Sequence, residues 1–119
     1  MIEMSRAAVE RREKRNAESR AWRAANPEKA KASVRATNLR KKFGLTPDQY
    51  ETMLQEQGGG CWICGKEPGP RRLAVDHDHK TRQVRGLLCG NCNQGIGRLQ
   101  DSPALLRRAA EYIERTRIQ

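Results

Sequence analysis

The sequence predicts a mostly helical α+β fold in which a small sheet is tied together by four cysteines. Three observations support this class. Helix caps and helical periodicity occur before Gly58 and again after Ser102. Two short runs between them, 73–77 and 84–88, have the length and apolar character of strands. The runs are flanked by two Cys-x-x-Cys pairs, Cys61–Cys64 and Cys89–Cys92.

The low hydrophobic content indicates that the core needs additional support. Of the 119 residues, 36% are hydrophobic and 4% are aromatic, which is little for a domain of this size. Four thiolates at this spacing can close a tetrahedral shell around zinc, and a closed shell makes the metal structural. Two disulfides are the alternative, but no signal peptide opens the chain. His77 and His79 are alternative zinc ligands that four cysteines leave unneeded.

Positive charge is concentrated in residues 1–42. This segment holds 13 Lys and Arg against 5 Asp and Glu, a net charge of +8 out of +10 for the whole chain. Such asymmetry predicts a polyanionic partner, and the alternative is a solvated tail. We expect a basic helical arm over 1–42, interrupted at Asn26-Pro27, and a separate domain over 43–119.

The second domain is predicted to contain helices on both sides of the strands. Thr46-Pro47-Asp48-Gln49 is a capping box, so a helix should begin there and end near Gln57. Its face of Tyr50, Met53 and Leu54 should pack on the core. A short helix is expected from Asn93 to about Gln100. A last helix should begin at Ser102-Pro103 and use its apolar face to close the core or to pair with another subunit.

The residues between the cysteine pairs are those that phosphodiester hydrolysis requires. Asp76-His77-Asp78-His79 lies between the pairs, and Asn93 follows the last cysteine. A histidine near neutrality can deprotonate water, so His77 is the candidate general base. A carboxylate and an amide oxygen, from Asp76 and Asn93, are hard ligands suited to one divalent cation.

Other roles for these residues stay open at this stage. The four-residue Asp-His repeat can be an exposed polar turn, and Asn93 can serve as a helix N-cap. If the first strand continued through His79, Asp76 and Asp78 would share a face, and Asp78 would compete as the metal ligand. His79 can instead position phosphate or bond to aspartate side chains.

The pattern resembles the recombination endonuclease VII family of HNH, or ββα-metal, nucleases. The resemblance rests on 76–79, 84–89, Cys92-Asn93 and Gly95-Ile96-Gly97, and it runs from about Lys41 to about Ile113. It implies a zinc-stapled ββα-metal core, a metal held by Asp76 and Asn93, and His77 as base. The best-studied branch has a glutamate where this chain has Ile96, which puts junction resolution in question.

The expected function is a Mg²⁺-dependent DNA endonuclease with structural Zn²⁺, in which Mn²⁺ can replace Mg²⁺. The resemblance implies 5′-phosphate and 3′-hydroxyl products, a phage or prophage origin in the host cytoplasm, and dimers among junction-resolving relatives. No apolar run is long enough for a membrane span. Rival functions are a non-catalytic zinc-containing DNA-binding module and a sequence-specific homing or restriction nuclease. The expected DNA contacts are Arg82, Arg85, Arg98, Lys41 and Lys42.

Overall fold

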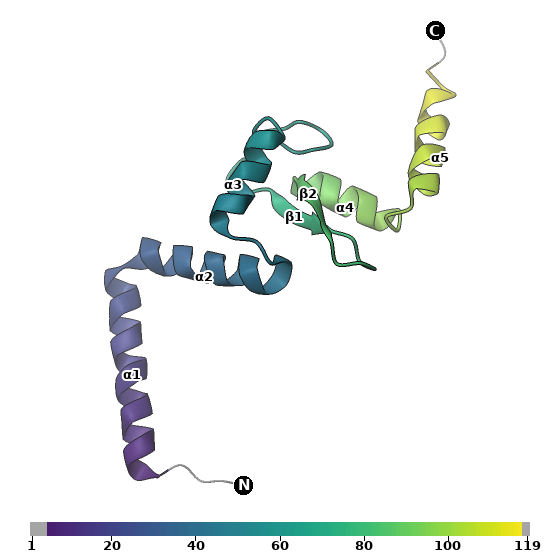
Figure 1. The fold of residues 1–119 in the computed structure, drawn as a ribbon. Helices are drawn as coiled ribbons and strands as arrows, with labels where there is room; N and C mark the ends of the chain where they lie inside the picture. Colours follow the sequence, from purple (N-terminus) through teal and green to yellow (C-terminus); the bar gives the residue numbers. More distant parts are fainter. Residues whose placement is uncertain (1–4, 118–119) are drawn as a thin grey trace. The chain divides into compact units, whose positions relative to one another are not determined.

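The computed structural model describes residues 5–117, which contain five helices and one two-stranded sheet. Contacts within the chain divide it into two units, with the boundary between Lys42 and Phe43. Within the described range no helix is both long and apolar enough to cross a membrane. In chain order (Figure 1) the elements are α1 (Arg6–Ala25), α2 (Pro27–Phe43), α3 (Pro47–Glu56), β1 (Ala74–His77), β2 (Val84–Leu88), α4 (Gly90–Arg98) and α5 (Pro103–Glu114).

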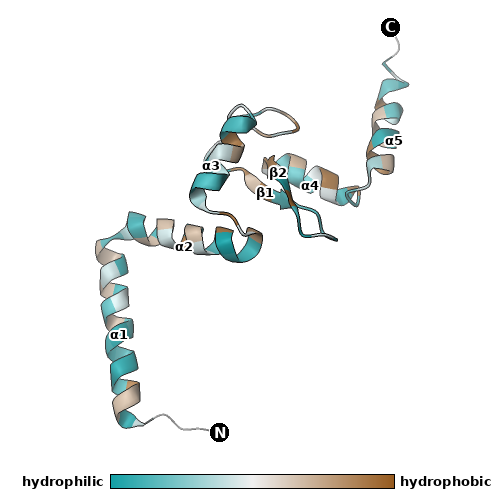
Figure 2. Ribbon diagram, in the orientation of Figure 1, coloured by the Kyte–Doolittle hydropathy of each residue, from teal (hydrophilic) through white to brown (hydrophobic). Residues whose placement is uncertain are grey.

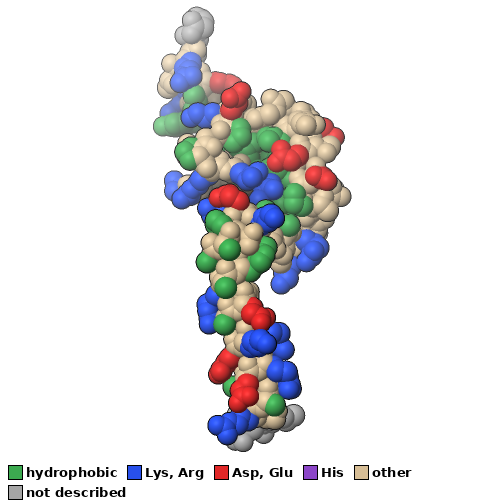
Figure 3. All heavy atoms as spheres, turned by 90° about the vertical axis from the view of Figure 1, so that its left-hand side faces the viewer, with side chains coloured by type: hydrophobic (Ala, Val, Ile, Leu, Met, Phe, Trp, Pro, Cys, Tyr) green, Lys and Arg blue, Asp and Glu red, His purple; other side chains and the backbone are tan. Residues whose placement is uncertain are grey.

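The first unit is almost entirely the two basic helices. Ser5 caps α1, and its hydroxyl accepts from the Ala8 N–H at 3.2 Å. The helix ends at Asn26, whose backbone and side-chain N–H groups both donate to the Trp22 carbonyl. No residue of α1 is buried, and Lys and Arg side chains lie along the arm in Figure 3. The helices and their break are therefore as predicted, and they contain little apolar surface for a core of their own.

Helix α3 begins at the predicted capping box. The Thr46 hydroxyl accepts from the Gln49 N–H at 3.1 Å, and the Gln49 side chain accepts from the Thr46 N–H at 2.8 Å. The predicted inner face is also confirmed, since Tyr50 is buried while Met53 and Leu54 are half-buried. The Tyr50 hydroxyl donates to the Leu73 carbonyl at 2.6 Å. This bond attaches the helix to the residue just before β1.

The sheet is an antiparallel hairpin with one irregularity beside the proposed site. Asp76 pairs with Gly86 and His77 pairs with Val84, so Arg85 is an extra residue on β2. A bulge of this kind bends a strand and redirects its side chains. In Figure 1 the hairpin lies between α3 and α4, and α4 contacts both strands.

The core of the second unit is small and lies around the hairpin. Figure 2 shows hydrophobic residues gathered at the strands, while α1 is largely hydrophilic. The Gln57 side chain connects α3 to β2 because it accepts from the Leu87 N–H at 2.8 Å and donates to the Leu87 carbonyl at 2.9 Å. The buried hydrophobic residues of this unit are Tyr50, Cys61, Leu73, Leu87 and Leu88.

The later helices differ from expectation in two respects. Helix α4 begins at Gly90, three residues before Asn93, because the Cys89 side chain caps it by accepting from the Cys92 N–H at 3.4 Å. Asn93 therefore lies inside the helix and is not its N-cap. Helix α5 begins after Ser102 as predicted but does not close the core, since none of its residues is buried. Pairing of its apolar face with another subunit stays a prediction.

The mostly helical α+β class is confirmed, and the four cysteines come together as the fold prediction required. The finer assignment of the hairpin and α4 as a ββα-metal core stays a prediction.

Candidate functional site

The four cysteines form a compact cluster that fits zinc. Their Sγ atoms all lie within 4.8 Å of one another, and the Sγ atoms of Cys64 and Cys89 are 3.8 Å apart. A tetrahedral zinc ion with Zn–S bonds of about 2.3 Å separates its ligands by about 3.8 Å. Four thiol donors and this spacing match the predicted structural site of Cys61, Cys64, Cys89 and Cys92.

Local backbone geometry brings the first cysteine pair into position. Cys61 donates its N–H to the Lys66 carbonyl at 2.9 Å, and Gly65 donates to the Cys61 carbonyl at 2.8 Å. Gly65 has φ of +75°, a left-handed conformation that favours glycine. Gly60 has no room for a side chain, because a Cβ atom there would collide with the backbone of Gly65. The second pair is held by the first turn of α4.

The thiols of the cluster do not share one ionisation behaviour. Burial opposes the Cys61 thiolate, but nearby backbone N–H groups, chiefly those of Cys64 and Cys89, outweigh it and lower the pKa of Cys61 to about 6. Burial, followed by hydrogen bonds with the neighbouring thiols, raises the pKa of Cys92 to about 12. Without a cation the cluster therefore holds protons that a metal would displace.

A second feature is a hollow of about 260 Å³ that brings the predicted hydrolytic residues together. Asp76 and His77 come from the end of β1, His79 from the following loop, and Asn93 from α4. Asp76 is buried at 8% exposure, whereas Asn93 is half-buried and the side chain of His79 is largely exposed. One carboxylate, one amide and two imidazoles thus line one small cavity, together with Val75 and Gln94.

The imidazole of His77 lies against two other rings. Its centroid is 5.8 Å from that of Phe43 and 5.0 Å from that of His79, both in tilted geometry. Tilted ring pairs at this distance are favourable packing arrangements. These two contacts restrict the orientation of the His77 ring, which lines the hollow. A fixed orientation suits the predicted role of His77 as a proton acceptor.

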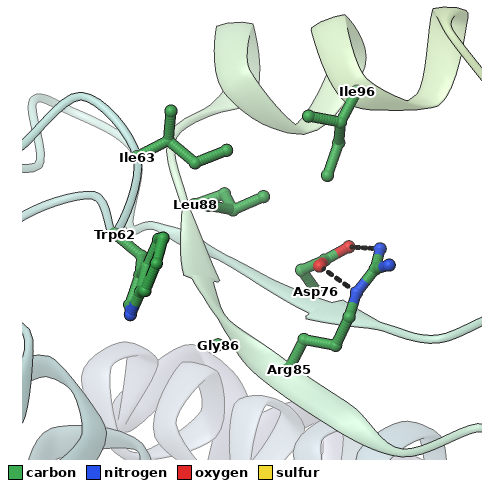
Figure 4. Close-up of a pocket in the computed structure, with 7 residues that line it drawn as sticks. All are labelled: Trp62, Ile63, Asp76, Arg85, Gly86, Leu88 and Ile96. Atoms are coloured by element: carbon green, nitrogen blue, oxygen red, sulfur yellow. Dashed lines mark hydrogen bonds and ion pairs between the residues drawn. The ribbon is translucent and has the colours of Figure 1, made fainter. Parts of the chain in front are cut away.

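Asp76 is bound by the guanidinium of Arg85 in a two-pronged ion pair. Nε of Arg85 is 2.7 Å from Oδ2 of Asp76, and Nη2 is 3.0 Å from Oδ1 (Figure 4). Nη2 also donates to Oδ2 of Asp101 at 3.2 Å. The hydrogen bonds to Asp76 are the main cause that raises the pKa of Arg85. The positively charged guanidinium of Arg85 therefore lies against the carboxylate of Asp76, the proposed metal ligand.

Asp78 is held outside the hollow by its own loop. Its Oδ1 accepts from the backbone N–H groups of Lys80 at 2.8 Å and Thr81 at 2.9 Å. These bonds, with that of Thr81 foremost, lower the pKa of Asp78. Strand β1 ends at His77, so the continuous strand that would have placed Asp78 beside Asp76 is not formed. Asp76 lines the hollow and Asp78 does not, and the role of Asp76 as a metal ligand stays a prediction.

The residues predicted to contact DNA lie in different parts of the chain. Arg85 forms ion pairs with the carboxylates of Asp76 and Asp101. Arg82 is in the hairpin loop with φ of +67°, and Arg98 is the exposed last residue of α4. Lys41 and Lys42 are exposed in the last turn of α2. Contact with DNA stays a prediction for all five.

An apolar hollow of about 330 Å³ lies on the other side of the Asp76–Arg85 pair. Ile63, Leu88 and Ile96 line it, and in Figure 4 Ile96 projects from α4 toward the strands. The hydrocarbon side chain of Ile96 has no atom that could ligate a metal.

Two residues at the site were missed by sequence reasoning. Gln94 lines the same hollow as Asp76 and His77, and adjacency to Asn93 was the available signal. Asp101 bonds to Arg85 and lies 3.4 Å from Nε2 of His79. No local motif marks Asp101, which is 25 positions from Asp76 in the sequence.

Comparisons with known proteins identify the class of this chain. The model of the recombination endonuclease VII family matches residues 36–115. The chain belongs to that family. It is 44% identical over 81 residues to the Gene 59 protein of Mycobacterium phage D29, covering 66% of this chain and 49% of the relative. It is also 44% identical over 79 residues to the Gene 59 protein of Mycobacterium phage L5, covering 65% and 48%.

The chain thus spans about half the length of these curated phage relatives. No solved structure matches. Family membership associates the chain with nucleases and with DNA, and the relatives are phage proteins.

Replacement of Cys64 by serine should remove the zinc and unfold the second unit. Zinc binding contributes on the order of 10 kcal/mol to folding in small zinc modules, and the second unit has a small core. Elemental analysis of the purified protein should find one zinc per wild-type chain, and circular dichroism should detect loss of structure in Cys64→Ser. Ser19→Ala, in the arm, is the control. Folded wild-type protein without zinc would contradict the prediction.

Proposed function

We propose that this protein is a metal-dependent DNA endonuclease that hydrolyses phosphodiester bonds, with His77 as general base. The observation that carries the proposal is the hollow shared by Asp76, His77, His79 and Asn93 in a chain of the endonuclease VII family. A mere zinc-containing binding module has no need for a carboxylate, an amide and two imidazoles in one cavity.

The donor set at the hollow suits a hard divalent cation. Asp76 offers a carboxylate oxygen and Asn93 an amide oxygen, and Mg²⁺ prefers such ligands while keeping several waters. A bound Mg²⁺ would neutralise charge on the phosphate and on the departing 3′ oxygen.

The chain's own residues would perform the remaining work. His77 would accept the proton of the attacking water, and its ring contacts with Phe43 and His79 restrict its orientation. The side chain of His79 is 72% exposed, although its Nε2 lies 3.4 Å from Oδ2 of Asp101, and it would donate a hydrogen bond to a phosphate oxygen. Thiolates of the zinc cluster would take no part in the chemistry, because four protein ligands leave no open position.

A binding-only module is the competing function, and one observation favours it. Both oxygens of Asp76 accept hydrogen bonds from Arg85, as in a purely structural ion pair. The two functions differ in whether DNA is cut when a divalent cation is present.

Nicking of supercoiled plasmid should distinguish them. We expect cleavage of plasmid, and of a four-way junction as a second substrate, with Mg²⁺ or Mn²⁺ and none with EDTA. His77→Ala should reduce the rate about 10²-fold or more, the usual contribution of a general base, while zinc content and DNA binding persist. His79→Ala, which alters the neighbouring ring, should have a smaller effect. Full activity of His77→Ala would exclude it as the base.

The metal dependence of cleavage should separate Asp76 from Asp78. Asp76→Ala should abolish cleavage at ordinary Mg²⁺ concentrations, because the hollow loses its carboxylate. Asp78→Ala should retain cleavage, because Asp78 is bound to the backbone of its own loop. Rates measured across a Mg²⁺ titration would show the reverse order if Asp78 were the ligand.

The arm should provide electrostatic affinity for DNA. Replacing Arg11, Lys14, Arg15 and Arg20 by glutamine keeps good helix formers and removes four positive charges. Each lost phosphate contact should reduce the slope of log affinity against log salt by about 0.9 on duplex DNA. Fluorescence anisotropy at several salt concentrations measures this slope. The matched control replaces four cations of the C-terminal segment: Arg107, Arg108, Arg115 and Arg117. An equal loss in both variants would show that the arm has no special role.

A further inference from the structure

The Arg85 guanidinium is shared between two carboxylates. It holds Asp76 through Nε at 2.7 Å and Nη2 at 3.0 Å, and the same Nη2 reaches Asp101 at 3.2 Å. Asp101 also lies 3.4 Å from Nε2 of His79. The side chains of Asp76 and Asp101 are 9% and 18% exposed, so both acceptors are largely shielded from water.

Backbone features bring all three groups together. The bulge makes Arg85 an extra residue on β2, opposite the step from Asp76 to His77. Asp101 has φ of +52° and follows Gln100 with φ of +61°. Left-handed backbone is unfavourable for most side chains, although aspartate tolerates it better than many. Hydrogen bonds from the N–H groups of these two residues to the end of α4 maintain the turn.

This arrangement conflicts with metal binding at Asp76. A guanidinium that occupies both carboxylate oxygens competes with a divalent cation for them, and the two positive charges repel each other. Each oxygen keeps a further lone pair, yet repulsion between the two cations favours release of at least one oxygen by Arg85 when Asp76 binds a metal. Asp101 offers a second acceptor that Arg85 already contacts, so the release need not leave the guanidinium without a partner.

We propose that Asp101 is a positioning residue that retains Arg85 when a divalent cation takes Asp76. The inference rests on the proposed role of Asp76 as metal ligand. Arg85 then reduces the affinity of the site for the cation, and Asp101 relieves part of this competition. The retained guanidinium stays beside the hollow, where it can meet a phosphate group of bound DNA.

Mn²⁺ binding to the zinc-loaded, DNA-free protein tests this without reference to cleavage. The electron paramagnetic resonance signal of free Mn²⁺ gives the dissociation constant. Arg85→Met should bind Mn²⁺ more tightly than wild type. Asp101→Asn should bind it about three- to tenfold more weakly, a size usual for residues in one ion-pair network. In the Arg85→Met background, Asp101→Asn should have almost no effect.

Two controls separate this mechanism from a simple change of net charge. Asp78→Asn also removes one negative charge near the site, yet it should change Mn²⁺ affinity less than Asp101→Asn. Arg85→Lys keeps the charge but lacks the planar fork that holds both oxygens. It should tighten Mn²⁺ binding, and it serves as the second variant if Arg85→Met fails to fold, as judged by zinc content and circular dichroism.

The outcomes distinguish this inference from the proposed function. If Asp101→Asn weakens Mn²⁺ binding equally in the wild-type and Arg85→Met backgrounds, or if Arg85→Lys binds no more tightly, the positioning role is overturned. If Asp76→Asn binds Mn²⁺ as well as wild type, Asp76 is not the ligand, and both fail together. If Asp76→Asn loses Mn²⁺ binding but the effects of Arg85→Met and Asp101→Asn simply add in the double variant, only the positioning role is overturned.

Discussion

The cluster of four thiols is the constraint on which the second unit depends. Cys61 precedes the hairpin and Cys89 follows it directly. The cluster therefore connects the segment before β1 to the residue after β2, at the open end of the hairpin. Few hydrophobic residues are buried around this hairpin, and an isolated two-stranded hairpin is only marginally stable in water. The same cluster also starts α4, because the Cys89 side chain is its N-cap. Through that helix it determines where Asn93 lines the hollow that Asp76 also lines.

Electrostatics at the hollow are balanced before any cation arrives. The buried carboxylate of Asp76 would be costly alone, and Arg85 satisfies it with a bidentate pair. Arg85 thus holds the carboxylate of the proposed metal ligand in a defined orientation. On the proposed function, such a partner would preserve the geometry and lower the affinity for the metal at the same time. A weak metal site would be compatible with the proposed reaction, in which the phosphate itself would supply further oxygen ligands.

Sequence reasoning succeeded where the signal was local. Thr46 and Ser102 are typical N-cap residues, and each precedes a helix at the predicted position. Residues 84–88 have the apolar content and length of the strand found there. It failed where the local structure depends on residues that are distant in the sequence or on an unusual cap. A cysteine is not a usual N-cap, so the start of α4 was placed at Asn93. The bulge at Arg85 depends on pairing across the hairpin, and the partnership with Asp101 depends on a left-handed turn. The cluster of cysteines was predictable because their spacing alone specifies it.

The side chain of Gln57 has a consequence for the free edge of β2. A two-stranded sheet has two open edges, and unpaired N–H and C=O groups on an edge can recruit strands from other molecules. On β2 the outward-facing N–H and carbonyl of Leu87 are both taken by the Gln57 amide, and the Trp62 N–H donates to the same carbonyl at 3.1 Å. One glutamine amide thus occupies the position of a neighbouring strand. Because the backbone N–H and carbonyl of Leu87 are already hydrogen-bonded, they cannot pair with a strand of another molecule.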